Sequence, residues 1–287
     1  IIEKIDRILN DNIFEGINIH YFGGEPLLNI PVLIYLDENI KKITDKIGIV
    51  YKAFLTTNGS MLSKELLQKV KFSSIQLTFD GLEKTHDRLR VSDHFHFKEE
   101  IELIENIMNF SQAKVLLRTN ICKENKDEII ALHKYIFEKF GNERIEINPN
   151  RTIKYHQDDS FEMLSVQEYA EVAYQIKLLW SEQKGKFELP VPRSTPCKFP
   201  YGNAYAISPE GYCTFCSGSM DQEKKYFFDV DIENKKMFSV RKECKKCNIL
   251  PLCLGGCIIQ YNLRAGACTY EKYELKNILI SYIKHIS

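Results

Sequence analysis

The cysteines of this chain are the residues best placed to do chemistry, because eight of the nine lie in its last third. Four of them have the spacing C-x2-C-x5-C-x3-C, namely Cys244, Cys247, Cys253 and Cys257. The other four of this region are Cys197, Cys213, Cys216 and Cys268. Thiolates at such short spacings bind zinc or iron–sulfur clusters, with about four thiolates at each site. Eight cysteines divide into two such sites, and spacing alone leaves zinc and iron both open.

Composition argues against three other classes of protein: disulfide-rich, nucleic-acid-binding and membrane-spanning proteins. The odd cysteine count and the lack of a visible secretion signal argue against a disulfide framework. Lys plus Arg equals Asp plus Glu at 39 each, so no basic surface for nucleic acid is indicated. No apolar run approaches the length of a membrane span. We therefore expect a cytoplasmic protein that has neither nucleic acid nor membrane as a partner.

Strands and helices are expected to alternate along the first 150 residues, ahead of the cysteine region. We expect strands over 17–22, 49–55, 74–80, 114–121 and 144–148. We expect helices over 1–10, 31–46, 97–110, from 63 onwards, and from a capping pair of Asn125 and Glu128 to Phe140. A further helix runs from Ser165, with Glu168, to about Gln183. Alternation of this kind predicts a parallel α/β sheet or barrel whose ligands bind at the carboxyl ends of the strands.

Polar residues lie at or near those strand ends. Gly23-Gly24-Glu25-Pro26, Thr57-Asn58-Gly59 and Asp80-Gly81 come at the ends of the first three strands, and Arg118 to Asn120 lie within the fourth. Tyr21 to Leu28 (YFGGEPLL) resembles the GGEP segment of radical S-adenosylmethionine (SAM) enzymes. The segments 56–59, 76–81 and 117–120 resemble later landmarks of that family, in the same order. The cysteine region, with Gly211 five residues before Cys216, resembles the SPASM extension, an auxiliary-cluster domain found on radical SAM peptide maturases.

The resemblance covers nearly the whole chain and implies a domain organisation. Residues 1–150 would form a partial (β/α)6-type radical SAM barrel that lacks its first strand. Residues 151–195 would be a linker and bridging helix, and residues 196–287 a small Cys-rich SPASM domain. The fold class is therefore α/β.

The resemblance also assigns roles to residues. Residues implied to bind SAM are Gly23, Gly24, Glu25, Pro26, Asn58 and Arg118, of which Arg118 suits the SAM carboxylate. Candidate pocket residues are Gln76, Thr78 and Asp80. One auxiliary [4Fe-4S] cluster would be held by Cys244, Cys247, Cys253 and Cys268. The other would be held by Cys197, Cys216 and Cys257, with Cys213 as fourth ligand or an iron left open. Cys122 lies outside the pattern.

One family motif is missing from the sequence. Radical SAM enzymes hold their SAM-binding [4Fe-4S] cluster with C-x3-C-x2-C, upstream of GGEP, and these 287 residues do not contain it. We expect that segment to precede Ile1 and expect this chain alone not to cleave SAM. The complete enzyme would modify side chains of a ribosomally made precursor peptide, as a thioether or other crosslink, through a 5′-deoxyadenosyl radical. An electron donor such as flavodoxin or ferredoxin would be its other partner.

Other readings remain open. An anaerobic sulfatase-type maturase would form formylglycine, but such enzymes carry Asp after the cysteine equivalent to Cys216, where this chain has Ser217. A non-catalytic barrel with structural zinc would act as a binding module. An NAD-type oxidoreductase is disfavoured because the glycine pair lacks the G-x-G-x-x-G spacing.

Overall fold

The structure is a computed structural model that describes residues 1–92, 94–141, 144–154, 161–194, 197, 204–214, 225–227, 240–257 and 268–286. Two compact units divide the chain. We call Ile2–Lys154 the sheet unit and Leu164–Ser287 the cysteine unit. Within the described ranges, no helix combines the length and the apolar character needed to cross a membrane.

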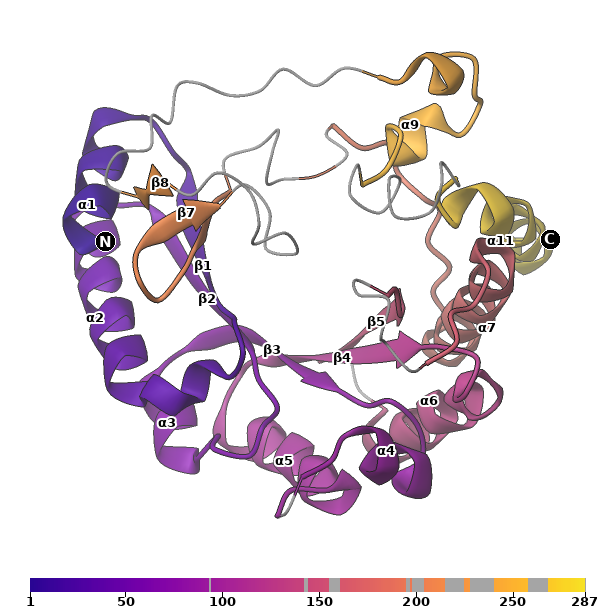
Figure 1. Ribbon diagram of the computed structural model, residues 1–287, viewed down its shortest axis with the longest axis horizontal. Helices are drawn as coiled ribbons and strands as arrows, with labels where there is room; N and C mark the ends of the chain where they lie inside the picture. The colour runs from indigo at the N-terminus through magenta and orange to yellow at the C-terminus, as the bar shows by residue number, and fades with distance from the viewer. Residues whose placement is uncertain are drawn as a thin grey trace. The chain divides into compact units, whose positions relative to one another are not determined.

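The sheet unit is built on five parallel strands whose order in the sheet is their order in the chain (Figure 1). The strands are β1 (Gly16–Tyr21), β2 (Val50–Thr56), β3 (Phe72–Thr78), β4 (Lys114–Ile121) and β5 (Ile145–Arg151). Each strand pairs in parallel with the next, and the register shifts once, on β2 between Ala53 and Phe54. All five carboxyl ends therefore meet at one edge of the sheet.

Helices follow the outer side of the curved sheet in Figure 1. They are α1 (Ile2–Asp11), the 3-10 turn η1 (Pro26–Asn29), α2 (Ile30–Ile47), α3 (Lys64–Lys69), α4 (Glu83–Leu89), α5 (Phe97–Phe110) and α6 (Lys126–Phe140). Alternate residues of β4 show how the two faces differ. Val115 and Leu117 are fully buried, whereas Arg118 and Asn120 are only partly buried. Side chains alternate between the faces of a strand, so one face packs apolar side chains and the other presents polar ones.

The predicted elements agree with the structure to within two residues at their ends, except at three places. The strand at 114–121 and the helix at 97–110 have the predicted bounds. The strand predicted over 144–148 continues to Arg151, and α4 was not predicted. The predicted cap at Asn125 is wrong: α6 begins after Asn125, but the side chain makes no capping hydrogen bond. That side chain is committed to contacts described below.

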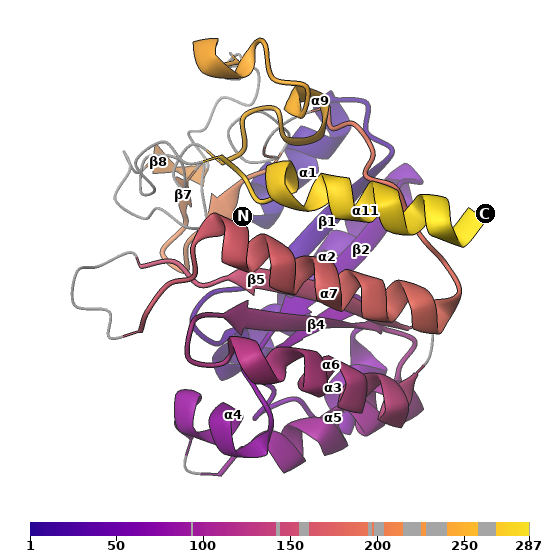
Figure 2. The ribbon, with the colours of Figure 1, turned by 90° about the vertical axis from the view of Figure 1, so that its right-hand side faces the viewer.

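The cysteine unit begins with a long helix, α7 (Val166–Lys184), which the predicted Ser165–Glu168 capping box initiates. The C-terminal helix α11 (Glu271–Ile286) lies beside α7 (Figure 2). Lys177 of α7 contacts both carboxylate oxygens of Glu274, at 2.7 and 2.9 Å. The other described elements are short: β6 (Ala206–Ile207), β7 (Tyr212–Thr214), β8 (Lys225–Tyr226), η3 (Lys242–Cys244) and α9 (Leu250–Cys253). Such short elements bury little apolar surface, so bound metal would add to the stability of this part.

Candidate functional site

Glu25 connects the loops that follow β1 and β2. Its Oε1 accepts hydrogen bonds from the Leu27 backbone N–H at 3.0 Å and from the Thr57 hydroxyl at 2.7 Å. Its Oε2 accepts from the backbone N–H of Asn58 at 2.7 Å. Hydrogen bonds to a carboxylate are stronger than neutral ones. Glu25 therefore holds two neighbouring strand-end loops in fixed register.

The glycines before Glu25 leave the loop backbone open. Gly23 has a φ of 154°, a conformation that L side chains rarely adopt. A Cβ added at Gly23 or Gly24 would meet nothing within 4 Å, so the space beside this backbone is free. Pro26 begins the η1 turn, where its missing N–H costs nothing. This stretch of backbone therefore faces open space beside the Glu25 carboxylate.

Asn58 forms the turn after β2. Its side-chain oxygen accepts from the backbone N–H of Ser60 at 3.0 Å and from the Ser60 hydroxyl at 2.8 Å. Gly59 follows with a φ of 86°, and a Cβ there would lie 2.6 Å from a methyl carbon of Leu103. The Asn58 side-chain oxygen therefore forms the turn. Asn58 lies beside Glu25 among the loops at the carboxyl ends of the strands, which we call the mouth.

A row of polar side chains crosses the inner face of the sheet. His20 Nε2 lies 2.8 Å from the Thr56 hydroxyl, and the Gln76 amide donates to the same oxygen at 3.3 Å. The Asn148 amide in turn donates to Gln76 Oε1 at 3.0 Å. Burial lowers the pKa of His20, which favours its neutral ring. Gln76 is thus the centre of a network that joins β1, β2, β3 and β5.

Thr78 and Arg118 lie next to this row. Thr78 is buried at the end of β3, two residues after Gln76 and so on the same face. Arg118 pairs with Thr78 in the register of β3 and β4. Its Nε donates to the Asn120 side-chain oxygen at 2.9 Å. The sheet therefore brings these two candidates together at adjacent strand positions.

Asp80 is a connection point between strand ends. One carboxylate oxygen accepts from the backbone N–H of Asn120 at 3.0 Å, and the other from Arg90 at 3.3 Å. Its backbone carbonyl accepts from the fully buried Asn125 amide at 2.7 Å. Asn125 also donates to the Asn120 carbonyl at 2.9 Å and accepts from the Cys122 backbone N–H at 2.9 Å. Both Asp80 oxygens are engaged, so Asp80 positions the loops of the mouth.

Two buried residues, His86 and Glu100, lie behind Asp80, and His86 contacts its backbone. His86 Nδ1 accepts from the Asp80 backbone N–H at 3.4 Å, and His86 Nε2 lies 3.2 Å from Glu100 Oε2. Burial lowers the pKa of His86 to about 4 and raises that of Glu100 well above its ordinary value. Both shifts favour uncharged forms, as expected for groups removed from water. Sequence reasoning missed Glu100, because its spacing looks like that of an ordinary helical surface residue.

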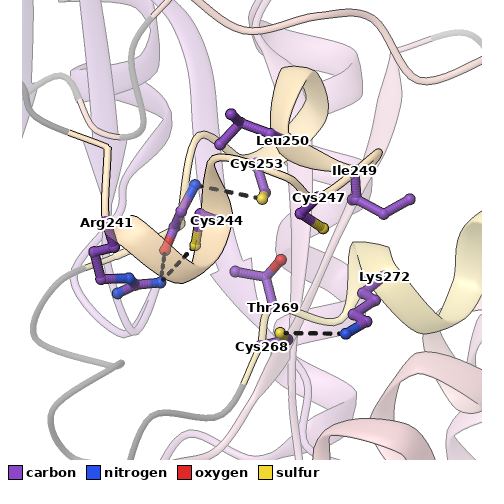
Figure 3. Close-up of a pocket in the computed structure, with 10 residues that line it drawn as sticks. Arg241, Cys244, Cys247, Ile249, Leu250, Cys253, Cys268, Thr269 and Lys272 are labelled. Atoms are coloured by element: carbon purple, nitrogen blue, oxygen red, sulfur yellow. Dashed lines mark hydrogen bonds between the residues drawn. The ribbon is translucent and has the colours of Figure 1, made fainter.

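Four cysteine thiols line one cavity in the cysteine unit (Figure 3). They are Cys244, Cys247, Cys253 and Cys268. None of the four takes part in a disulfide. The cavity has a volume of about 30 Å³, room for about two water molecules. This is the thiol set that the family resemblance implied for one auxiliary cluster.

Three of these sulfurs have an N–H group beside them. The distances are 3.8 Å from Arg241 Nη2 to Cys244 Sγ, 3.4 Å from Gly255 N to Cys253 Sγ, and 3.8 Å from Lys272 Nζ to Cys268 Sγ. N–H contacts to cysteine sulfur are the interactions that tune iron–sulfur clusters. In chemical type this donor set fits a metal held by thiolates.

The thiols are gathered but not in a coordinating arrangement. Across the described residues, no group of three or more His, Cys, Asp or Glu could hold a metal ion as it stands. The small cavity agrees with this, since a four-iron cluster is larger than two waters. Metal binding would therefore require the sulfurs to move, which couples it to the folding of this unit.

The second predicted cysteine set is described only in part. Cys213 lies in β7 and is 1% exposed, and its burial raises the pKa of the thiol to about 11. Cys197 and Cys257 are partly buried. Cys216 falls outside the described residues, so this set remains a prediction.

Comparison with solved structures identifies the fold. No protein-family model and no curated protein matches the sequence. The sulfatase-maturating enzyme anSMEcpe, solved with bound S-adenosylmethionine, matches with a TM-score of 0.70 at 17% identity, over 100% of this chain and 90% of that one. Its complex with the Kp18Cys peptide matches with a TM-score of 0.69 at 18% identity, over 99% and 88% of the two chains.

A second enzyme gives the same result. SuiB from Streptococcus suis, bound to S-adenosylmethionine, matches with a TM-score of 0.58 at 18% identity, over 91% of this chain and 66% of that one. Both are radical SAM enzymes. At these identities the likeness concerns the fold, and it agrees with the expectation from the sequence motifs. This chain therefore has the α/β fold of the radical SAM enzymes that its motifs resemble.

Proposed function

We propose that this chain is the SAM-binding and auxiliary-cluster part of a radical SAM enzyme that matures peptides. The observation that carries the proposal is the gathering of four thiols around one cavity, three of them with an N–H group beside the sulfur. A second observation supports the SAM-binding role: Glu25 is fixed by hydrogen bonds among the loops at the carboxyl ends of the strands. The comparison structures that hold SAM have the same fold.

The residues of the mouth would bind and orient SAM. The open backbone at Gly23 and Gly24 would accept its amino-acid end, and the guanidinium of Arg118 would bind its carboxylate. Glu25 would hold the loops after β1 and β2 together, and the hydrogen-bond network centred on Gln76 would fix the strand positions beneath them. Bound iron–sulfur clusters would supply one-electron chemistry, while the protein contributes positioning and exclusion of water.

The SAM-cleaving step requires ligands that these residues do not provide. The sequence contains no C-x3-C-x2-C motif. We propose that the ligands of the third, SAM-binding cluster lie outside the 287 residues, and that this chain by itself does not cleave SAM. A cytoplasmic electron donor such as flavodoxin or ferredoxin would complete the system.

Two peptide-directed reactions compete as the outcome. Crosslinking of a ribosomally made precursor is the first, and Ser217 in place of the expected Asp supports it. Oxidation of a peptide cysteine to formylglycine is the second, and the match to peptide-bound anSMEcpe supports that one. Mass spectrometry of the product separates them. A crosslink loses two hydrogen atoms and keeps the sulfur, whereas formylglycine replaces the sulfur by an aldehyde oxygen.

The first test is the metal content of the chain purified without oxygen. Two auxiliary four-iron clusters predict about eight iron and eight sulfide per chain, with visible absorption. About two zinc, no sulfide and no colour would instead show a structural zinc module and would overturn the proposal. A Cys253→Ser variant should lose about half of the iron, and a Cys122→Ala variant should keep all of it, because Cys122 lies outside the cysteine unit.

A further inference from the structure

Two basic side chains reach sulfurs of the cavity from different elements (Figure 3). Arg241, just before η3, places Nη2 3.8 Å from Cys244 Sγ. Lys272, in the first turn of α11, places Nζ 3.8 Å from Cys268 Sγ. Two of the four thiols of this site therefore each have a cation in contact.

Arg241 also organises the loop that follows α9. Its Nη2 donates to the Gly255 carbonyl, and the Gly255 backbone N–H donates to Cys253 Sγ at 3.4 Å. Gly255 has a φ of 87°, which suits glycine, and a Cβ there would lie 3.6 Å from Arg241 Nη2. Arg241 thus acts on two sulfurs, on Cys244 directly and on Cys253 through the loop.

A cation or N–H donor beside a ligand sulfur stabilises added negative charge on a metal–thiolate site. Reduction of an iron–sulfur cluster adds one electron and breaks no bond, so such groups favour the reduced form and raise the reduction potential. We propose that Arg241 and Lys272 set the reduction potential of the cluster bound by Cys244, Cys247, Cys253 and Cys268, each making it easier to reduce. This inference rests on the proposed function, in that the site must hold an iron–sulfur cluster.

The two cations should differ in strength. The Arg241 side chain is 24% exposed, whereas Lys272 is an exposed residue. Water and salt screen exposed charges more than partly buried ones. The contribution of Lys272 should therefore shrink as ionic strength rises, and that of Arg241 should persist.

The test is a redox titration of the anaerobically purified chain, with a chemical reductant as electron source and electron paramagnetic resonance as the readout. The variants are Arg241→Gln and Lys272→Met, each of which removes one cation from a sulfur. Lys246→Met is the matched control. Lys246 lies between Cys244 and Cys247 in the sequence but does not line the cavity, so this variant removes one positive charge without removing a contact to a sulfur. We expect the reduction equilibrium constant to fall about tenfold for Arg241→Gln and less for Lys272→Met, where tenfold corresponds to about 59 mV for one electron.

Each result has a defined meaning. If the iron content is normal and both variants titrate like the parent and Lys246→Met, the inference is overturned and the proposed function stands. If the parent chain binds no iron, the proposed function itself fails. If Arg241→Gln loses iron, Arg241→Lys restores the cation and should restore iron with a potential near that of the parent. In that case a normal potential in Lys272→Met at low salt would still refute the role of Lys272.

Discussion

Replacement of His133 by Gln should flatten the acid dependence of stability in the sheet unit. His133 lies in α6, is 0% exposed, and has Nε2 3.0 Å from the Thr119 hydroxyl of β4. Burial lowers the pKa of this ring to about 3, because its charged form would lose its hydration. In the unfolded chain the ring would titrate near its ordinary value of about 6.5.

The sign and size follow from this difference. Between pH 6.5 and pH 3 the unfolded chain binds a proton on His133 and the folded chain does not, so acid favours unfolding. Each pH unit in that window lowers the free energy of unfolding by up to about 1.4 kcal/mol. The first one and a half units below pH 6.5 are therefore worth about 2 kcal/mol, and the full window about 5 kcal/mol.

Urea unfolding followed by circular dichroism at several pH values between 7.5 and 5 would measure this slope. His133→Gln cannot take up a proton, so its curve should be flatter than the parent curve by about 1 kcal/mol per pH unit. The exposed His94 provides the control, since His94→Gln should leave the slope unchanged. Parallel curves for the parent and His133→Gln would refute the reasoning, whatever their vertical offset. Other buried groups, such as His86, are present in both proteins and cancel.

Three further substitutions test the site. Asn125→Ala removes three hydrogen bonds of a fully buried side chain and should cost about 3 kcal/mol of unfolding free energy in urea titrations, whereas Asn12→Ala at an exposed position should cost little. Glu25→Gln turns one acceptor into a donor facing a backbone N–H and should cost about 2 kcal/mol by the same assay; an unchanged midpoint would contradict the loop-joining role. Removal of metal with a chelator should lower the thermal unfolding midpoint of the parent, measured by calorimetry. The same treatment should lower the midpoint of Cys253→Ser by less.

Local patterns predicted most elements of the sheet unit but not every boundary. The strand at 114–121 is apolar on alternate residues and has the predicted bounds. The last strand runs beyond its predicted end because Pro149 is tolerated on β5, which pairs only with β4 among the described strands. Helix α4 escaped prediction because it buries only His86 and has no side-chain cap, so it carries no periodic apolar signal.

The sequence named candidate residues but could not predict the contacts that they make. The expected strand ends predicted Glu25 and Asp80 as candidates, since parallel strands place their carboxyl ends together, and the family resemblance implied Gln76. The partners of these residues come from far along the chain, as Asn148 does for Gln76 at a separation of 72 residues. No local rule selects one distant amide among many. For the same reason the side chain of Asn125 was expected to cap α6, while the fold uses it between β3 and β4.

The strand order of the sheet also bears on how this chain folds during synthesis. Because every strand pairs with the one made just before it, each new helix and strand emerging from the ribosome meets an edge that is already formed. Among the described strands of this sheet, none has to be inserted between two that are already paired, so the entropy of closing long loops is met in small steps. The sheet unit should therefore assemble progressively from its N-terminal end, and the contacts of Glu25 would form before those of Asn148.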